Sequence, residues 1–124
     1  MAWLLGNSLT DAPVSFVVTV PGKNAPQIKA ALCELIISFI MITMALNTSA
    51  INSTKKYTRI FAAVLVFSNV IFAGPVSGFG MNPARSFASA FPANTWAAFW
   101  IYVFCPIIGM MSAAELFLLL QKHR

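Results

Sequence analysis

The stretch from residue 78 to residue 91, "GFGMNPARSFASAF", gathers side chains of this chain that could make directed polar contacts. Asn82 offers amide N–H donors, and Arg85 carries a permanent positive charge on a planar fork of N–H donors. Asparagine is among the best residues to precede a helix, and proline is favoured at the first helical position, so Asn82 and Pro83 predict a helix start. Arg85 follows Asn82 at a spacing of three and lies on the same helix face. These residue types suit the donation of hydrogen bonds to a ligand and the exclusion of cations.

The remaining residues give little support to an enzyme. The carboxylates of the chain are Asp11, Glu34 and Glu115, and its one histidine, His123, lies in the C-terminal tail. The sequence offers no evident nucleophile, general base or metal-ligand cluster. We therefore expect no catalytic residue, no metal site and no cofactor.

The composition indicates that much of the surface faces lipid. Charged residues make up 9% of the chain and its mean hydropathy is +0.80, whereas soluble domains carry about a quarter charged residues. Three segments, at about 28–46, 57–73 and 96–120, have the length and apolar character to span a bilayer as helices. We expect the second to end at Gly74 and Pro75, because proline cannot continue a helix. The predicted fold class is therefore an all-α membrane protein with three transmembrane helices.

The polar stretch lies between the second and third spans and predicts a shorter helix. A helix at about 82–91 is roughly 14 Å long, half of a bilayer, before Pro92 and Asn94 end it. The simplest arrangement is a re-entrant half-helix that dips into the membrane and returns to the same side. Non-helical backbone at that depth is tolerated where it lines a watery cavity, and an arginine there is a functional-site hypothesis. The alternative is an exposed outer loop with Arg85 as an ordinary surface residue.

The basic residues predict the orientation of the spans. Lys55, Lys56 and Arg59 follow the first span, and Lys122 and Arg124 follow the third. The positive-inside rule places both groups, and with them the C-terminus, in the cytoplasm.

The opposite side then carries residues 1–27 and the connection at 74–95, with Trp96, Trp100 and Tyr102 in an interfacial belt. This topology explains the net charge of +5, so no nucleic-acid partner is expected. We expect an integral protein of a plasma membrane or of a bacterial inner membrane.

The run "NPARS" at 82–86, the following "FWIYVFCPIIG" and the earlier "LCELIISF" together resemble the second half of an aquaporin, in the major intrinsic protein family. Residues 12–22 are similar to the long external loop of that family, and "MAWLL" to the end of a preceding helix. The resemblance implies that residues 1–27 form this external loop and the tail of a preceding helix. Residues 28–124 are then an aquaporin-like half-channel repeat in the lipid bilayer.

The resemblance also implies roles for the polar stretch. Asn82 is expected to be one of two asparagines that donate N–H groups to a single file of water at the bilayer centre. Pro83 and Ala84 complete this pore motif and shape the contact. Arg85 belongs to the expected selectivity filter, where it gives donors to the permeant and repels cations.

Two further filter positions are implied by the same resemblance. Val70 lies about 20 Å along the second span, near Arg85 in depth, where water-selective members usually have histidine. Phe79 stands at another filter position, where an aromatic residue resembles the glycerol facilitators. Ser86 and Tyr102 instead resemble the water branch. The expected function is a passive channel for water, with passage of small neutral solutes such as glycerol left open.

Glu34, within "LCELIISF", matches a buried glutamate of the family's fourth helix. The resemblance implies that its carboxylate accepts backbone N–H groups of the re-entrant loop and supports that loop. The alternative places Glu34 near the outer interface, with its side chain snorkelling towards water.

The family has six spans in two inverted repeats, and this chain resembles one repeat. We therefore expect the C-terminal half of a longer channel, completed by a complementary N-terminal half or by homologous subunits, and tetrameric when complete. The alternative from a different class is a non-conducting truncated or accessory membrane protein that binds a partner subunit.

Overall fold

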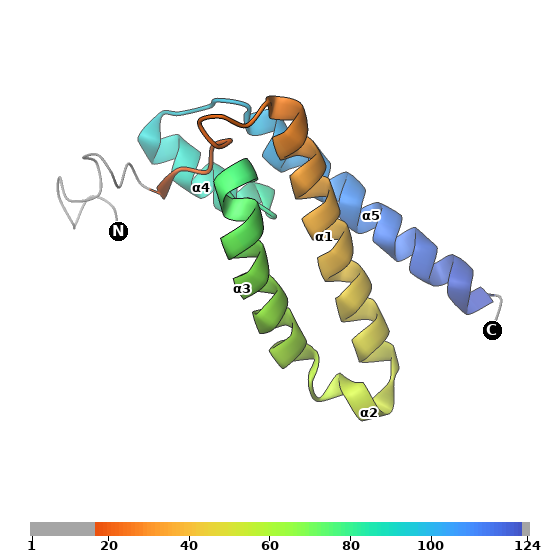
Figure 1. Cartoon of the computed structure of the whole chain (residues 1–124). Coiled ribbons are helices and arrows are strands. Elements are labelled where there is room, and N and C mark those ends of the chain that lie inside the picture. Colours follow the sequence, from red (N-terminus) through yellow and green to blue (C-terminus); the bar gives the residue numbers. More distant parts are fainter. Residues whose placement is uncertain (1–16, 123–124) are drawn as a thin grey trace.

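The computed structural model describes residues 17–122, and within that range the regular elements are all helices (Figure 1). The prediction of an all-α fold is confirmed. The predictions for residues 1–16, which include the tail of a preceding helix, lie outside the described residues. In chain order the helices are α1 (Gln27–Ala50), α2 (Asn52–Lys55), α3 (Thr58–Ser77), α4 (Pro83–Ala93) and α5 (Phe99–Lys122).

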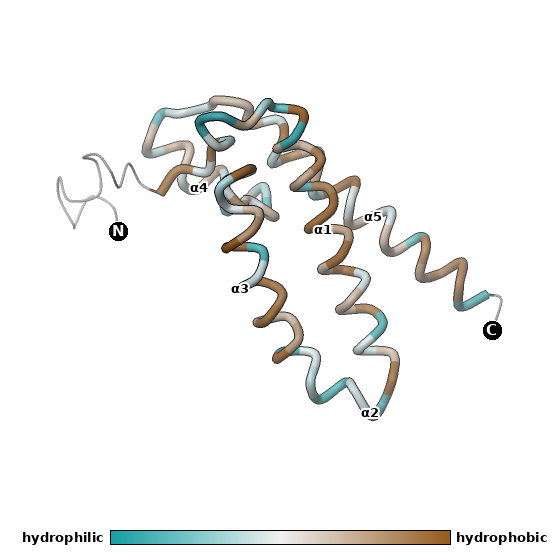
Figure 2. The backbone as a smooth tube through the Cα atoms, in the orientation of Figure 1, coloured by the Kyte–Doolittle hydropathy of each residue, from teal (hydrophilic) through white to brown (hydrophobic). Residues whose placement is uncertain are grey.

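Three of these helices, α1, α3 and α5, are long and apolar enough to cross a membrane, as predicted. The mean hydropathy of the most apolar 18 residues is 2.0 in α1, 2.0 in α3 and 2.1 in α5, and apolar residues follow one another along all three helices (Figure 2). Many of their large side chains point outward, including Phe67, Phe72 and Leu118, which are 68%, 78% and 63% exposed. A surface of this kind requires lipid or another apolar partner.

Helices α1 and α5 start at the same end of the bundle and pack against each other along a crossing contact (Figure 1). Gly109 of α5 touches the backbone of Leu35 and Phe39 on α1, a close approach that only a small residue permits. Nearer the starts of the two helices lies a buried cluster made of Ala30, Ala31, Ile101, Tyr102 and Cys105.

Helix α3 runs back beside α1, so that its C-terminal end lies near the start of α1 (Figure 1). The N–H of Gly22 donates to the carbonyl oxygen of Val76 at 3.0 Å and joins these two ends. A second buried cluster, of Ile37, Ala73 and Phe79, links α1, α3 and the loop that leads into α4. The short helix α4 therefore enters the bundle from the end at which α1 and α5 begin.

Helix α3 continues through Pro75 to Ser77, so the prediction that this span ends at Gly74 and Pro75 was wrong. Proline removes only its own N–H, whose partner in a regular helix is the carbonyl of Ile71, and membrane helices tolerate that loss where neighbours pack well. The helix ends instead at Gly78, which adopts a left-handed φ of 81° and donates its N–H to the carbonyl of Gly74.

The other helix limits differ from the predicted ones by a few residues. Helix α1 extends to Ala50, and α5 begins at Phe99. Pro92 was expected to end the short helix, but α4 includes it and stops at Ala93. Pro92 lies in the last turn, where one missing N–H removes little, and the left-handed Asn94 (φ 46°) then ends the helix.

Candidate functional site

The loop at 78–81, which joins α3 to α4, is held by the carboxylate of Glu34 on α1. Glu34 is fully buried, and it accepts hydrogen bonds from the backbone N–H of Gly80 at 2.9 Å and of Met81 at 2.7 Å. Its Oε1 also accepts the hydroxyl of Ser77 at 2.6 Å. The alternative of an interfacial, snorkelling Glu34 is therefore wrong, because none of the side chain reaches the surface of the described chain.

This loop has an unfavourable backbone that needs such support. Gly78, Phe79 and Met81 have φ angles of 81°, 55° and 52°, in the left-handed region. That region suits glycine, but it costs other residues about 1–2 kcal/mol each. The hydrogen bonds to Glu34 satisfy the N–H groups of Gly80 and Met81 in this conformation, so the buried carboxylate offsets the local strain.

Two side chains that the sequence did not single out for the loop complete this network. The Ser77 hydroxyl accepts the N–H of Phe79 at 3.2 Å, and the Tyr102 hydroxyl of α5 donates to the carbonyl oxygen of Ser77. Tyr102 was expected in an interfacial belt, but it is fully buried, so that prediction was wrong. The sequence gives little indication of the role of Ser77, which is a lone hydroxyl residue beside Gly78. It lies 25 residues before Tyr102, too far for a helical or strand spacing to relate the two.

The contact with Glu34 also places the start of α4 inside the bundle. Glu34 lies seven residues after Gln27, the first residue of α1, and at the helical rise it is therefore about 10 Å below that end. Met81 is bonded to Glu34 and directly precedes Asn82. Helix α4 has 11 residues and is therefore about 16 Å long.

Asn82 caps the start of α4, as the Asn-Pro pair predicts. Its Oδ1 accepts the N–H of Ala84 at 2.9 Å, and Pro83 occupies the first helical position. Because Oδ1 is engaged, the amide NH₂ is the part of the side chain left to donate to a ligand. Asn82 and Ala84 are both exposed on the described chain.

Arg85 lies one turn further along α4, with its guanidinium carbon 5.4 Å from the centre of the Phe79 ring. This is the geometry of a cation–π contact. Phe79 is buried and Arg85 is exposed, and within residues 17–122 no carboxylate forms an ion pair with Arg85. Val70 is half-exposed on α3, and no described contact ties it to Arg85 or Phe79. The structure thus brings two of the three expected filter residues together.

Three helices of membrane length, with a short helix whose start is tied to α1 through Glu34 and Met81, define an integral membrane protein. Residues 4–117 match the family described as Major intrinsic protein, and the chain belongs to that family. Members of this family are membrane channels and not enzymes, in agreement with a sequence that offers no catalytic residues.

Three relatives illustrate the similarity. Aquaporin NIP2-2 of Zea mays is 36% identical over 106 residues, which cover 82% of this chain and 35% of that protein. Aquaporin NIP1-2 of Oryza sativa subsp. japonica is 34% identical over 107 residues, which cover 86% of this chain and 35% of that protein. Nodulin-26 of Glycine max is 30% identical over 124 residues, which cover 92% of this chain and 45% of that protein. The chain therefore spans less than half the length of these curated relatives.

Proposed function

We propose that this chain forms one half of a transmembrane channel for water that also admits small neutral solutes such as glycerol. The observation that carries the proposal is the start of α4. There a helix N-terminus, the Asn82 amide and the Arg85 guanidinium come together about 10 Å inside the bundle. All of these groups are hydrogen-bond donors or positive charges, which suit the oxygen of an uncharged permeant.

The expected mechanism follows from these donors. The free N–H groups at the start of a helix carry a partial positive charge, and an asparagine NH₂ beside them donates to a passing oxygen. A water molecule held in this way turns its own hydrogens away from the helix end, which interrupts proton transfer along a file of water. Arg85 adds a full positive charge that repels cations. Pro83 and Ala84 keep the wall beside Asn82 small and free of competing side-chain donors.

The filter composition supports passage of small solutes in addition to water. Phe79 presents an aromatic ring under Arg85, and Val70 is a short apolar side chain without a donor. We expect Val70 to line the completed pore together with Arg85, so that an apolar wall accommodates the carbon chain of glycerol while the guanidinium binds its hydroxyls. A histidine at position 70 would instead narrow the passage and add a polar group.

A complementary part is expected to complete the pore. The relatives are more than twice as long as the matched region, and α4 leaves Phe87 and Phe91 50% and 67% exposed. An apolar face of this kind supports packing against a second half, and we propose a tetramer for the complete assembly. The basic residues Lys55, Lys56 and Arg59 support a cytoplasmic C-terminus.

The test is osmotic flux in vesicles. The chain is reconstituted alone and together with the part of nodulin-26 that precedes the matched region, and light scattering follows shrinkage in sucrose and re-swelling in glycerol. We expect flux above empty vesicles when both parts are present. Asn82→Asp should abolish most of it, whereas Asn94→Asp makes the same charge change at the other end of α4 and should preserve it.

The outcomes separate the two candidate functions. Flux that requires the second part and falls with Asn82→Asp supports the half-channel. If neither reconstitution conducts although both parts are folded and associated, the channel proposal is wrong and the chain is better explained as a non-conducting partner subunit.

A further inference from the structure

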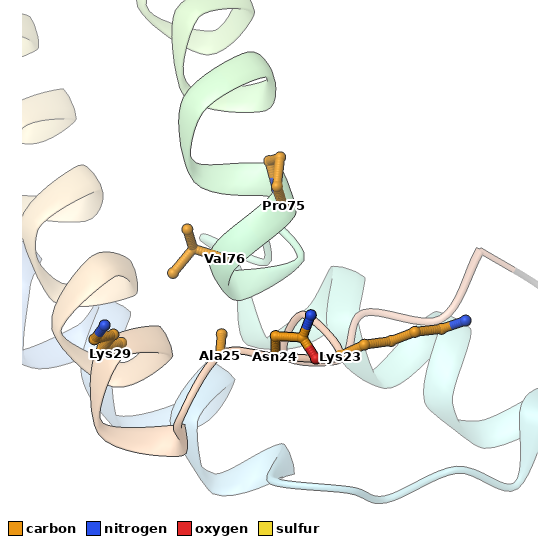
Figure 3. Close-up of a pocket in the computed structure, with 6 residues that line it drawn as sticks. All are labelled: Lys23, Asn24, Ala25, Lys29, Pro75 and Val76. Atoms are coloured by element: carbon orange, nitrogen blue, oxygen red, sulfur yellow. The ribbon is translucent and has the colours of Figure 1, made fainter.

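A hollow of about 350 Å³ lies where α1 begins and α3 ends. Figure 3 shows Lys29 on α1, Pro75 and Val76 on α3, and residues 23–25 on the segment that leads into α1. Because two helices of membrane length begin and end here, we expect this level to be that of the lipid headgroups. Its lining residues are Lys23, Asn24, Ala25, Lys29, Pro75 and Val76.

The walls of this hollow are fixed by the fold. The N–H of Gly22 donates to the carbonyl of Val76 at 3.0 Å, and the N–H of Ala25 donates to the carbonyl of Gly22 at 2.9 Å. A side chain at position 22 would collide with the carbonyl oxygen of Pro75. The segment therefore packs directly on the end of α3, and the backbone itself fixes this side of the hollow.

The rim of the hollow is positive, and within residues 17–122 no carboxylate lies near it to neutralise it. Lys23 and Lys29 are exposed, and in residues 17–122 no lysine forms an ion pair with a carboxylate. Of the two carboxylates in that range, Glu34 is buried and engaged with the 78–81 loop, and Glu115 lies near the far end of α5. Lys23 extends outward along the segment in Figure 3, and its flexible four-carbon stem lets the ammonium reach an anion on the rim.

An apolar track of outward-facing side chains follows the lining residues one turn further along each of the two helices. Leu32 lies one turn after Lys29, and Phe72 lies one turn before Val76, so both side chains follow the lining residues along their helices. Leu32 is 53% exposed and Phe72 is 78% exposed. A soluble anion would use only the positive rim, whereas a phospholipid would use the rim and this track together.

We propose that this hollow binds the phosphate of an anionic membrane lipid, with Lys23 and Lys29 at the phosphate and an acyl chain along Leu32 and Phe72. The site is separate from α4, so it does not depend on conduction. Its ligand is a structural component of the membrane rather than a permeant.

The test measures lipid binding to the full chain in detergent micelles by native mass spectrometry. The probes are dioleoylphosphatidylglycerol, which is anionic, and dioleoylphosphatidylcholine, which has the same acyl chains and no net charge. We expect the double variant Lys23→Gln/Lys29→Gln to weaken phosphatidylglycerol binding by roughly ten- to thirty-fold, as expected for two lysines at a membrane surface. The matched variant Lys55→Gln/Lys56→Gln removes the same charge at the end of α2 and should leave that binding unchanged.

Two further comparisons make the lipid assignment falsifiable. Phe72→Ser changes only an outward-facing side chain and should weaken phosphatidylglycerol binding several-fold. Displacement of the lipid by millimolar inorganic phosphate would instead identify a soluble anion as the ligand and overturn the proposal. Equal losses in the two double-lysine variants, or equal binding of the two lipids by the unaltered chain, would also overturn it, because either result shows unspecific attraction.

Discussion

Tyr102 on α5 donates a hydrogen bond from its hydroxyl to the carbonyl oxygen of Ser77, the last residue of α3. The bond joins the two helices one residue before the backbone turns left-handed at Gly78. Both residues are fully buried, so neither group has water as an alternative partner. The path of the chain into α4 therefore depends on a side chain that arrives 25 residues later in the sequence.

Replacement of this hydroxyl is predicted to destabilise the bundle without loss of packing volume. Tyr102→Phe leaves a buried carbonyl oxygen at Ser77 without its donor, which costs about 1–3 kcal/mol in the free energy of unfolding. The measurement is unfolding in mixed micelles with increasing dodecyl sulfate. Tyr57→Phe is the control, because Tyr57 is 44% exposed. Equal stability of both variants would show that the bond to Ser77 contributes nothing.

Glu34→Gln is predicted to release the loop at 78–81. A glutamine has one carbonyl oxygen and one NH₂, so the NH₂ replaces one of the two acceptor oxygens and faces the N–H of Gly80 or Met81. We expect a loss of roughly 2–3 kcal/mol in the free energy of unfolding, because hydrogen bonds to charged groups are the stronger kind. Faster amide exchange at Gly80 and Met81 should accompany it.

The control for that variant is Glu115→Gln, which changes an exposed carboxylate near the end of α5. It should leave exchange at the loop unchanged. Slow exchange at both loop amides in Glu34→Gln would contradict the assigned role of the carboxylate.

Two glycines in membrane helices are predicted to respond oppositely to the same substitution. Gly109→Ala places a methyl group against the backbone carbonyl of Leu35 and should separate α1 from α5, with a loss of about 1–3 kcal/mol from overpacking. Gly74→Ala meets nothing within 4 Å and should be neutral or stabilising, since alanine favours helix by about 1 kcal/mol over glycine. Unfolding midpoints of the two variants give the comparison directly. A stable Gly109→Ala variant would mean that the close crossing of α1 and α5 is not required.

Removal of the Arg85 charge tests the proposed selectivity filter of the proposed two-part channel. In vesicles that also carry the first part of nodulin-26, Arg85→Val should raise cation leakage roughly ten-fold, the change that about 1.4 kcal/mol of lost repulsion gives. Water flux should persist, because Asn82 and the helix end remain. Arg59→Val, which removes an exposed charge at the start of α3, should leave cation leakage unchanged. Tight exclusion of cations by Arg85→Val would assign selectivity to other groups.

The parts of the fold that follow from local chemistry were predictable from the sequence. The three apolar runs gave helices of membrane length, and Asn82 with Pro83 gave the start of α4, because caps and hydropathy are short-range properties. The burial of Glu34 is not a local property. Only its resemblance to a family position indicated that contact, since an acidic residue in an apolar run is equally compatible with snorkelling.

The errors arose where tertiary contacts overrode local rules. Pro75 does not end α3, because the packed helix continues until Gly78 supplies the left-handed turn. Tyr102 was expected to be an interfacial aromatic residue, yet it is buried. Its hydroxyl donates to Ser77, which belongs to another helix. No spacing rule connects two such residues, so the sequence could not reveal their hydrogen bond.

The sequence distance between Glu34 and its donors has a consequence for synthesis in the cell. The groups that satisfy this carboxylate are 43, 46 and 47 residues further along the chain. A ribosome delivers α1 to the membrane before the 78–81 loop, so during translation the helix enters lipid while Glu34 still lacks these donors, at a cost of about 2.5–3.5 kcal/mol. The carboxylate gains its backbone donors only when Gly80 and Met81 have been synthesised. Insertion of α1 is therefore not fully stabilised until then, and a nascent chain that stalls before residue 80 leaves α1 open to extraction and quality control.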